Sequence, residues 1–288
     1  MRVLYEIDLP QDLTPQPLAE LLEHELFLPR KVRHFLRMRK GVALNGVPKN
    51  FAETAHPGDH LTLTLADSDY PQPQVLSDDF QTLQVLYEDP WLLIVNKPAG
   101  IKVHPNEPHE RGTLLNQIAG YLQKTGQMPY VVHRLDQATS GAILFAKDPV
   151  ILPILDRLLR EKAIRRVYQA EVWGKLPQSE MTIDRAIGRD RHDPKKRCVT
   201  AKGGKKAVTH LKVLQFANGK SRLRVTLSTG RTHQIRVHLA ALGHPLVNDP
   251  LYGKKTPQGR LMLHSYQLSL RHPYTHQTIS VTAEPGIF

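Results

Sequence analysis

The sequence predicts an α+β protein with a central mixed, largely antiparallel sheet and flanking helices. Residues 81–288 contain many short strand-like segments and few helical ones, the clearest near 150–161 and 234–242. The 22 prolines and 18 glycines indicate many turns rather than long helices. With 40% hydrophobic residues in 288, the chain can bury a core, and its length suits one large domain plus a small one.

Residues 1–66 predict the small domain, of α/β type. Apolar residues recur at helical spacing over 18–26 and again from Pro29 to Gly41. A hairpin with the turn Asn45-Gly46 follows, and then an alternating strand over 60–65. This order predicts two helices packed on a short sheet.

Between the two domains we expect a semi-rigid linker over residues 67–80, which contain prolines and several aspartates. The large domain then spans 81–288. Its strand-like segments include the apolar run 142–146 and the alternating run 165–174.

The charge of the chain is uneven. Residues 1–70 hold 8 basic and 10 acidic residues, whereas 71–288 hold 31 basic and 17 acidic, so the larger region carries the whole excess of the net +12. Within it, residues 157–206 contain 15 basic and 6 acidic residues. Such clustering, with a pI near 9.8, favours a polyanionic partner, nucleic acid first, over a merely solvated basic surface.

Other features limit the class of protein. A single cysteine, Cys198, excludes a disulfide framework and a multi-cysteine zinc site, and it fits a reducing cytoplasm. The first residues resemble neither a signal peptide nor a spanning helix, and no apolar run is long enough to cross a membrane. His233 and His238 are five residues apart, which does not match a helical metal-binding pair. We expect a cytoplasmic monomer without membrane contact, metal or cofactor.

The most informative run is His133-Arg134-Leu135-Asp136, shortly before the apolar segment 142–146. On an extended chain, Arg134 and Asp136 point to one side while Leu135 faces the core. The spacing alone leaves two readings open, a positioned catalytic acid and a structural ion pair.

This run, continued by Thr139-Ser140-Gly141, resembles the catalytic signature of the RluA family of RNA pseudouridine synthases. Three further segments resemble the same family: 85–105, 165–174 and 227–253. The resemblance implies the pseudouridine synthase fold and the isomerisation of uridine to pseudouridine in structured RNA.

The family's functional residues can be carried over to matching positions. The resemblance implies that Asp136 is the catalytic carboxylate, that Tyr168 stacks on or acts near the target base, and that Arg231 is the active-site arginine, which we expect to pair with Asp136. Tyr168 could remove the proton from carbon 5 of the base only if its pKa is lowered or if that proton is acidic enough. We expect Arg134 and His133 to face the RNA.

The small domain resembles the RNA-binding domain named after ribosomal protein S-four, although residues 16–19 depart from the usual start of its first helix. No acidic residue occurs from 27 to 52. The side chains there that we expect to bind RNA are Arg30, Lys31, Arg33, Arg37 and Lys40.

Ribosomal RNA of the large subunit is the favoured substrate, and transfer RNA is possible. Two alternatives remain: a non-catalytic RNA-binding or ribosome-assembly protein, and a carboxylate-dependent N-glycosidase that would leave abasic RNA. Whether Asp136 acts as nucleophile or base is open at this point.

Overall fold

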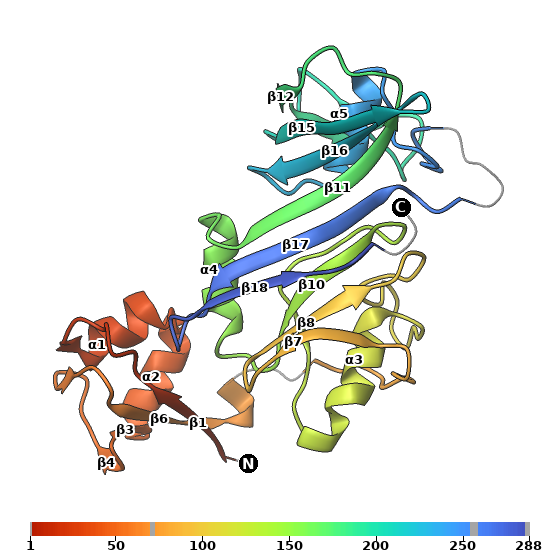
Figure 1. The fold of residues 1–288 in the computed structure, drawn as a ribbon. Helices are drawn as coiled ribbons and strands as arrows, with labels where there is room; N and C mark the ends of the chain where they lie inside the picture. Colours follow the sequence, from red (N-terminus) through yellow and green to blue (C-terminus); the bar gives the residue numbers. More distant parts are fainter. Residues whose placement is uncertain (1, 70–72, 254–258, 286–288) are drawn as a thin grey trace.

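The computed structural model describes residues 2–69, 73–253 and 259–285. A small N-terminal domain lies beside a larger part that is built on one long sheet (Figure 1). Within the described ranges, no helix combines the length and apolarity needed to cross a bilayer.

The N-terminal domain is a four-stranded antiparallel sheet with helix α2 against strand β6. Its strand order is β1-β6-β3-β4. The bounds are β1 Arg2–Asp8, β3 Val42–Leu44, β4 Val47–Pro48, β6 His60–Ala66 and α2 Arg30–Met38. The predicted second helix, hairpin and alternating strand are therefore confirmed. Strand β1, which pairs with β6 along its whole length, was not expected.

The first predicted helix takes a different form. Helix α1 (Leu18–Glu20) passes directly into a π-helical turn, η1 (Leu21–Glu25), in which the Leu26 amide bonds to the Leu21 carbonyl at 2.9 Å. The short strands β2 (Gln16–Pro17) and β5 (Thr54–Ala55) pair beside it. The apolar spacing correctly marked the buried face, but the wider turn depends on packing.

The larger part contains one ten-stranded sheet in the order β12-β15-β16-β11-β17-β10-β8-β7, with β18 beside β17 and β9 beside β10. Its pairings are antiparallel except that of β10 with β17, which confirms the predicted mixed, largely antiparallel sheet. The bounds are β7 Gln84–Glu88, β8 Leu92–Lys97, β9 Tyr130–Val131, β10 Ser140–Ala146, β11 Arg165–Trp173, β12 Glu180–Asp184, β15 Val208–Ala217, β16 Lys220–Leu227, β17 Leu263–Arg271 and β18 Thr278–Thr282.

Three α-helices accompany this sheet: α3 (Leu114–Leu122), α4 (Leu152–Arg160) and α5 (Gln234–Ala241). The last two confirm the helices predicted near 150–161 and 234–242. A separate two-stranded hairpin, formed by β13 (Ile187–Arg189) and β14 (Arg197–Val199), lies against α5. We call residues 187–199 the basic hairpin.

Strand β10 is buried on both faces, which explains its uninterrupted apolar run. Leu144 and Ala146 join a core that also contains residues of the N-terminal domain. Ile143 and Phe145 point the other way, into a core shared with α3 and α5. The strand that follows Asp136 is therefore held rigidly from two sides.

Gly141 is required where β10 meets β17. Its φ is +112°, and a Cβ there would lie 2.3 Å from the Ser265 carbonyl oxygen and 2.6 Å from the Ser265 nitrogen. A glycine alone combines that backbone angle with so close an approach. The parallel contact between β10 and β17 thus depends on this one position.

Polar contacts also join the two domains. The Arg157 guanidinium stacks on the Phe27 ring at 3.7 Å from its centroid, and Asp12 pairs with Arg271 and His276.

Of the predicted linker, residues 70–72 lie outside the described residues. The described linker residues are attached at both ends. Asp69 pairs with Arg39 in the small domain, and the carbonyl of Leu76 accepts a hydrogen bond from Asn116 in α3. The division into 1–66, 67–80 and 81–288 stays a prediction.

Candidate active site

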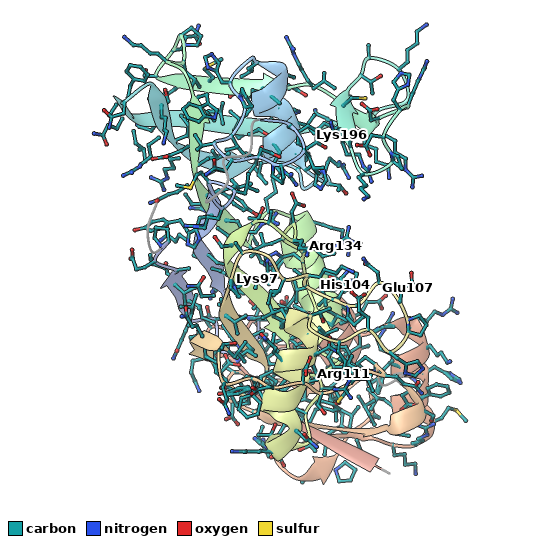
Figure 2. The ribbon with its side chains drawn as sticks, turned by 90° about the vertical axis from the view of Figure 1, so that its right-hand side faces the viewer. Lys97, His104, Glu107, Arg111, Arg134 and Lys196 are labelled. Carbon is teal, nitrogen blue, oxygen red and sulfur yellow. The ribbon has the colours of Figure 1, made fainter. Side chains whose placement is uncertain are left out.

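A cavity of about 1230 Å³ opens where the loop before β10 approaches β11 and the start of α5. Asp136 is the only carboxylate among its described lining residues. Nine lysines and arginines line it as well: Lys102, Arg134, Arg160, Lys162, Arg165, Arg166, Arg224, Arg231 and Arg236. In Figure 2, Arg134 and His104 lie near the middle of the view, and Lys196 lies above them. The cavity therefore combines one acid with a strongly cationic wall.

Backbone contacts hold the loop that presents Asp136. Leu135 is buried beside it, and the Thr139 amide bonds to the Asp136 carbonyl at 3.0 Å. The next residue, Gln137, exchanges two hydrogen bonds of 2.8 Å with the backbone of Gly100. The carboxylate is thereby fixed at the end of a tight turn.

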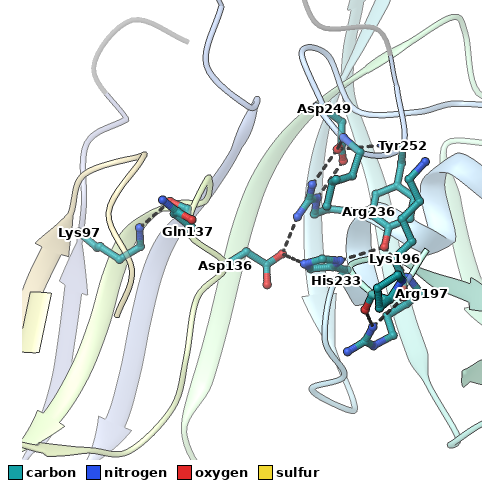
Figure 3. Close-up of polar contacts among 11 residues, drawn as sticks. Lys97, Asp136, Gln137, Lys196, Arg197, His233, Arg236, Asp249 and Tyr252 are labelled. Atoms are coloured by element: carbon teal, nitrogen blue, oxygen red, sulfur yellow. Dashed lines mark hydrogen bonds and ion pairs between the residues drawn. The ribbon is translucent and has the colours of Figure 1, made fainter. Parts of the chain in front are cut away.

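Lys97 supports the same loop from below. Its side chain is fully buried, and Nζ donates to the carbonyls of Pro98 and Ile101 at 2.9 and 2.8 Å. Nζ also donates to the Gln137 carbonyl at 3.1 Å (Figure 3). Burial lowers the pKa of Lys97 to about 8, while the nearby charge of Asp136 opposes that shift. Lys97 thus stabilises the turn through carbonyl oxygens and not through a paired acid.

The arginine that pairs with Asp136 is Arg236, and the expected pair with Arg231 is wrong. Arg236 Nη1 lies 3.2 Å from Asp136 Oδ2, whereas the Arg231 side chain is exposed and donates Nε–H to the Lys206 carbonyl. Arg231 precedes α5 in the turn at the cavity rim. Arg236 lies within the helix, whose first turns aim it inward. Both residues are arginines of the same matched segment, five positions apart, so the resemblance alone could not show which of them contacts Asp136.

Arg236 is itself held by a second carboxylate. Its Nε and Nη2 donate to the two oxygens of Asp249 at 2.9 and 2.8 Å, and both side chains are almost fully buried. Burial would lower the pKa of Arg236, but Asp249 and then Asp136 raise it above its usual value. The guanidinium therefore stays charged and rigidly oriented toward Asp136.

Tyr168 lies in β11 and lines the cavity with only 4% of its surface exposed. Burial raises the pKa of its phenol. The hydroxyl is therefore protonated at neutral pH, so a lowered pKa does not make Tyr168 a base, and the second condition, an acidic carbon 5 proton, stays a prediction.

His133 lines the cavity but is nearly buried, and its role in facing the RNA stays a prediction. The side chain is 6% exposed, and its Nε2 accepts a hydrogen bond from the Leu144 amide at 3.2 Å. Burial, together with the charge of Arg166, lowers the pKa of His133 to about 3. Arg134, the next residue, is exposed at the cavity.

The predicted RNA-binding side chains of the small domain are exposed with one exception. Arg30, Lys31, Arg37 and Lys40 are exposed, and Lys31 and Arg37 lie over aromatic rings. Arg33 differs, because its guanidinium forms a two-point ion pair with Glu23 and also donates to the Leu28 carbonyl. Its charge is balanced within the domain.

Three further residues of the site were not predicted: His233, Tyr252 and Asp249. His233 Nε2 lies 3.9 Å from Asp136 Oδ2, and its Nδ1 is 2.9 Å from the Tyr252 hydroxyl (Figure 3). All three fall within the segment 227–253 that resembles the family. Their spacing along the chain shows no periodic pattern, so sequence reasoning alone had no signal that they meet.

Comparison with known proteins agrees with this fold. The sequence profile of the family described as RNA pseudouridylate synthase matches residues 91–241, and that of the RluD ribosomal pseudouridine synthase N-terminal domain matches residues 5–61. The chain belongs to the RNA pseudouridine synthases, as the resemblance implied.

Individual relatives extend the match over most of the chain. The uncharacterized RNA pseudouridine synthase YhcT of Bacillus subtilis is 46% identical over 232 residues, which cover 78% of this chain and 75% of the relative. Ribosomal large subunit pseudouridine synthase D of Neisseria meningitidis serogroup B is 37% identical over 262 residues, with coverages of 84% and 68%. Among solved structures, human RNA pseudouridylate synthase domain containing 1 aligns with a TM-score of 0.62 at 28% identity, covering 73% of this chain and 86% of that one.

Proposed function

We propose that this protein isomerises uridines in structured RNA of the large ribosomal subunit to pseudouridine, with Asp136 as the catalytic carboxylate. One observation carries the proposal: Asp136 is the single acid among the described residues of a cavity that nine lysines and arginines also line. A polyanionic substrate enters such a cavity favourably, and the acid marks where chemistry occurs on it.

The reaction suits these residues because it is an isomerisation. The bond between the sugar and base nitrogen 1 breaks, the uracil turns, and sugar carbon 1 bonds to base carbon 5. Carbon 5 loses one proton while nitrogen 1 gains one, so composition does not change. Arg236 keeps Asp136 oriented, and the protonated phenol of Tyr168 offers an aromatic face to the uracil. We do not assign the removal of the carbon 5 proton to Tyr168.

A uridine in a duplex must leave its stack to reach Asp136, at a cost of a few kcal/mol. Arg134 is exposed at the cavity next to Asp136 and is the side chain we assign to the vacated space. Phosphate contacts from the cavity wall and from Arg30, Lys31, Arg37 and Lys40 would offset that cost.

The choice of ribosomal RNA rests on the names of the relatives. One relative is named ribosomal large subunit pseudouridine synthase D, and residues 5–61 match a domain profile named for a ribosomal pseudouridine synthase. Mapping pseudouridine in a deletion strain tests the choice. We expect sites to disappear from large-subunit RNA, whereas losses confined to transfer RNA would refute it.

The test of catalysis is Asp136→Asn, assayed by tritium release from RNA labelled at carbon 5 of uridine. We expect no release, with RNA binding and folding retained. Asp79→Asn is the matched control, because Asp79 is exposed and away from the cavity. Normal release by Asp136→Asn would refute the role of Asp136. A loss of RNA mass would indicate base removal instead, since isomerisation leaves mass unchanged.

Binding should also depend on salt. If the cavity wall contacts several phosphates, the affinity for RNA should fall about tenfold or more between about 50 and about 200 mM salt. An affinity that stays constant over that range would contradict phosphate contacts as the source of binding.

A further inference from the structure

Tyr252 lies where three parts of the site meet. Its hydroxyl accepts a hydrogen bond of 2.8 Å from the Arg197 backbone amide in the basic hairpin. The same hydroxyl is 2.9 Å from His233 Nδ1, and the Arg236 guanidinium lies 5.2 Å from the centre of the ring. Figure 3 shows this chain of contacts ending at Asp136.

The Tyr252 ring also supports the basic hairpin from beneath. It packs against a small core formed by Ile187, Ala207 and Val237, which joins the hairpin to α5. The hairpin and the loop after it carry a dense set of cations: Arg189, Arg191, Lys195, Lys196, Arg197, Lys202, Lys205 and Lys206. The position of Tyr252 is therefore tied to the element of this domain best suited to hold phosphates.

The hydrogen bonds at the hydroxyl determine a tautomer. Because the oxygen accepts from Arg197, the Tyr252 proton is free to be donated, and His233 Nδ1 is its acceptor among the described residues. Nδ1 then carries no proton, so the proton of neutral His233 resides on Nε2. That nitrogen is the one that faces Asp136.

Arg236 and His233 approach the same oxygen of Asp136. Arg236 Nη1 is 3.2 Å and His233 Nε2 is 3.9 Å from Oδ2, while Oδ1 has no hydrogen-bond partner among the described residues. His233 begins α5 in the left-handed region, with φ of +58°, so its ring is held in place by a strained backbone. In the opposite tautomer, the Nε2 lone pair would face the carboxylate and repel it.

We propose that Tyr252 and His233 are positioning residues for the isomerisation: the Tyr252 hydroxyl, held by the Arg197 amide, keeps the His233 proton on Nε2, which faces Oδ2 of Asp136 at 3.9 Å, and Oδ1 is left for the uridine. The inference rests on the proposed role of Asp136. It makes the basic hairpin part of the active site, since RNA held by the hairpin also fixes the Arg197 amide.

The charges around His233 are consistent with a neutral ring. Burial lowers its pKa, the charge of Asp136 opposes this, and Arg236 and Arg197 lower it further, with Asp249 as a weaker opposing charge. A neutral imidazole has one N–H, so its location matters. Tyr252 decides it.

The first test is Tyr252→Phe, which removes the hydroxyl and keeps the ring in its small core. We expect kcat for tritium release to fall about tenfold, with KM for RNA unchanged, because the hydrogen bond between the Tyr252 hydroxyl and His233 is lost and the His233 N–H no longer faces Asp136 in every molecule. Tyr121→Phe is the matched control. The Tyr121 hydroxyl also donates a hydrogen bond, to Glu88 at 2.6 Å, but lies outside the cavity. A change in KM alone, or no change in kcat, would overturn the inference.

The second test uses His233→Gln, whose amide nitrogen can occupy the place of Nε2 but cannot change tautomer. We expect Tyr252→Phe to cost nothing further in kcat in this background. A full and additive tenfold loss in kcat would show that the hydroxyl acts through some group other than His233. That result would refute the positioning role proposed for Tyr252. This comparison of double and single variants separates positioning from general damage.

A third measurement needs neither RNA nor turnover. In protein labelled with ¹⁵N histidine, His233 of the wild type should show a protonated Nε2 and an unprotonated Nδ1, and Tyr252→Phe should show a mixture. A wild-type ring protonated on Nδ1 would overturn the inference even if a variant failed to fold. If Asp136→Asn were as active as the wild type, the proposed function would fail first. If Asp136→Asn were inactive while Tyr252→Phe kept the wild-type kcat, only the positioning role of Tyr252 and His233 would be refuted.

Discussion

Replacing Arg236 by glutamine removes three hydrogen bonds at once. Two go to the oxygens of Asp249, and one goes to Oδ2 of Asp136. The first pair is buried, with side chains 3% and 0% exposed, whereas Asp136 retains 24% of its side-chain surface. The same substitution therefore affects stability mainly through Asp249 and activity mainly through Asp136.

The two effects have different sizes. Leaving Asp249 charged, buried and unpaired should lower the free energy of unfolding by about 3 to 5 kcal/mol. Losing a hydrogen bond to the proposed catalytic carboxylate should raise the activation free energy by about 1.5 to 3 kcal/mol. This corresponds to a fall in kcat of roughly 10- to 150-fold.

The assay pairs urea unfolding with tritium release. The double variant Arg236→Gln/Asp249→Asn removes the unpaired charge, and asparagine still offers an oxygen to the amides of Leu251 and Tyr252. We expect it to recover most of the lost stability but none of the lost activity. Arg231→Gln is the matched control, with kcat retained because Arg231 does not contact Asp136.

Two outcomes would refute this reasoning. If the double variant regained activity along with stability, Arg236 would serve only the fold. If Arg231→Gln lost as much kcat as Arg236→Gln, the assignment of the Asp136 partner to Arg236 would be wrong.

Two further predictions concern the scaffold. Because burial holds the pKa of His133 near 3, the unfolded chain takes up a proton that the folded chain does not. Stability should therefore fall by about 1 to 2 kcal/mol from pH 6.5 to 5; His133→Gln, which still accepts from Leu144, should lose this part of the slope in urea titrations, and an unaltered slope would contradict it. Gly141→Ala should cost about 3 kcal/mol or more, because its Cβ meets Ser265, whereas Gly230→Ala meets nothing within 4 Å; equal unfolding midpoints would contradict this.

Local elements of the fold were predictable where the signal was local. Helix α2, strand β6 and helices α4 and α5 each show their period within a few residues. Strand β1 carries no comparable signal, because its place is decided by a partner more than fifty residues away. Helix α3 was overlooked although Thr113 and Asn116 form a capping box, a start signal that is readable in the sequence.

The candidate site divides in the same way. Asp136 and Tyr168 lie in segments whose residue order identifies the family, and both line the cavity. His133 lies in the same run and also lines the cavity, yet it is only 6% exposed, and its Nε2 accepts a hydrogen bond from the Leu144 amide. A motif shows which residues occur together and does not show which way each side chain points.

The sequence by itself predicted the mixed sheet and the cationic surface from residue type and short spacing, and its resemblance to a known family indicated the class of enzyme and the proposed catalytic acid, Asp136. Only the tertiary structure decided the partners of that acid. Asp136 is faced by Arg236 and His233, and these two side chains are held by Asp249 and Tyr252. The four residues come together because α5 and the segment after it dock against the loop before β10. Those segments are about a hundred residues apart, and hydrogen-bond geometry across such a distance depends on packing that no local pattern records.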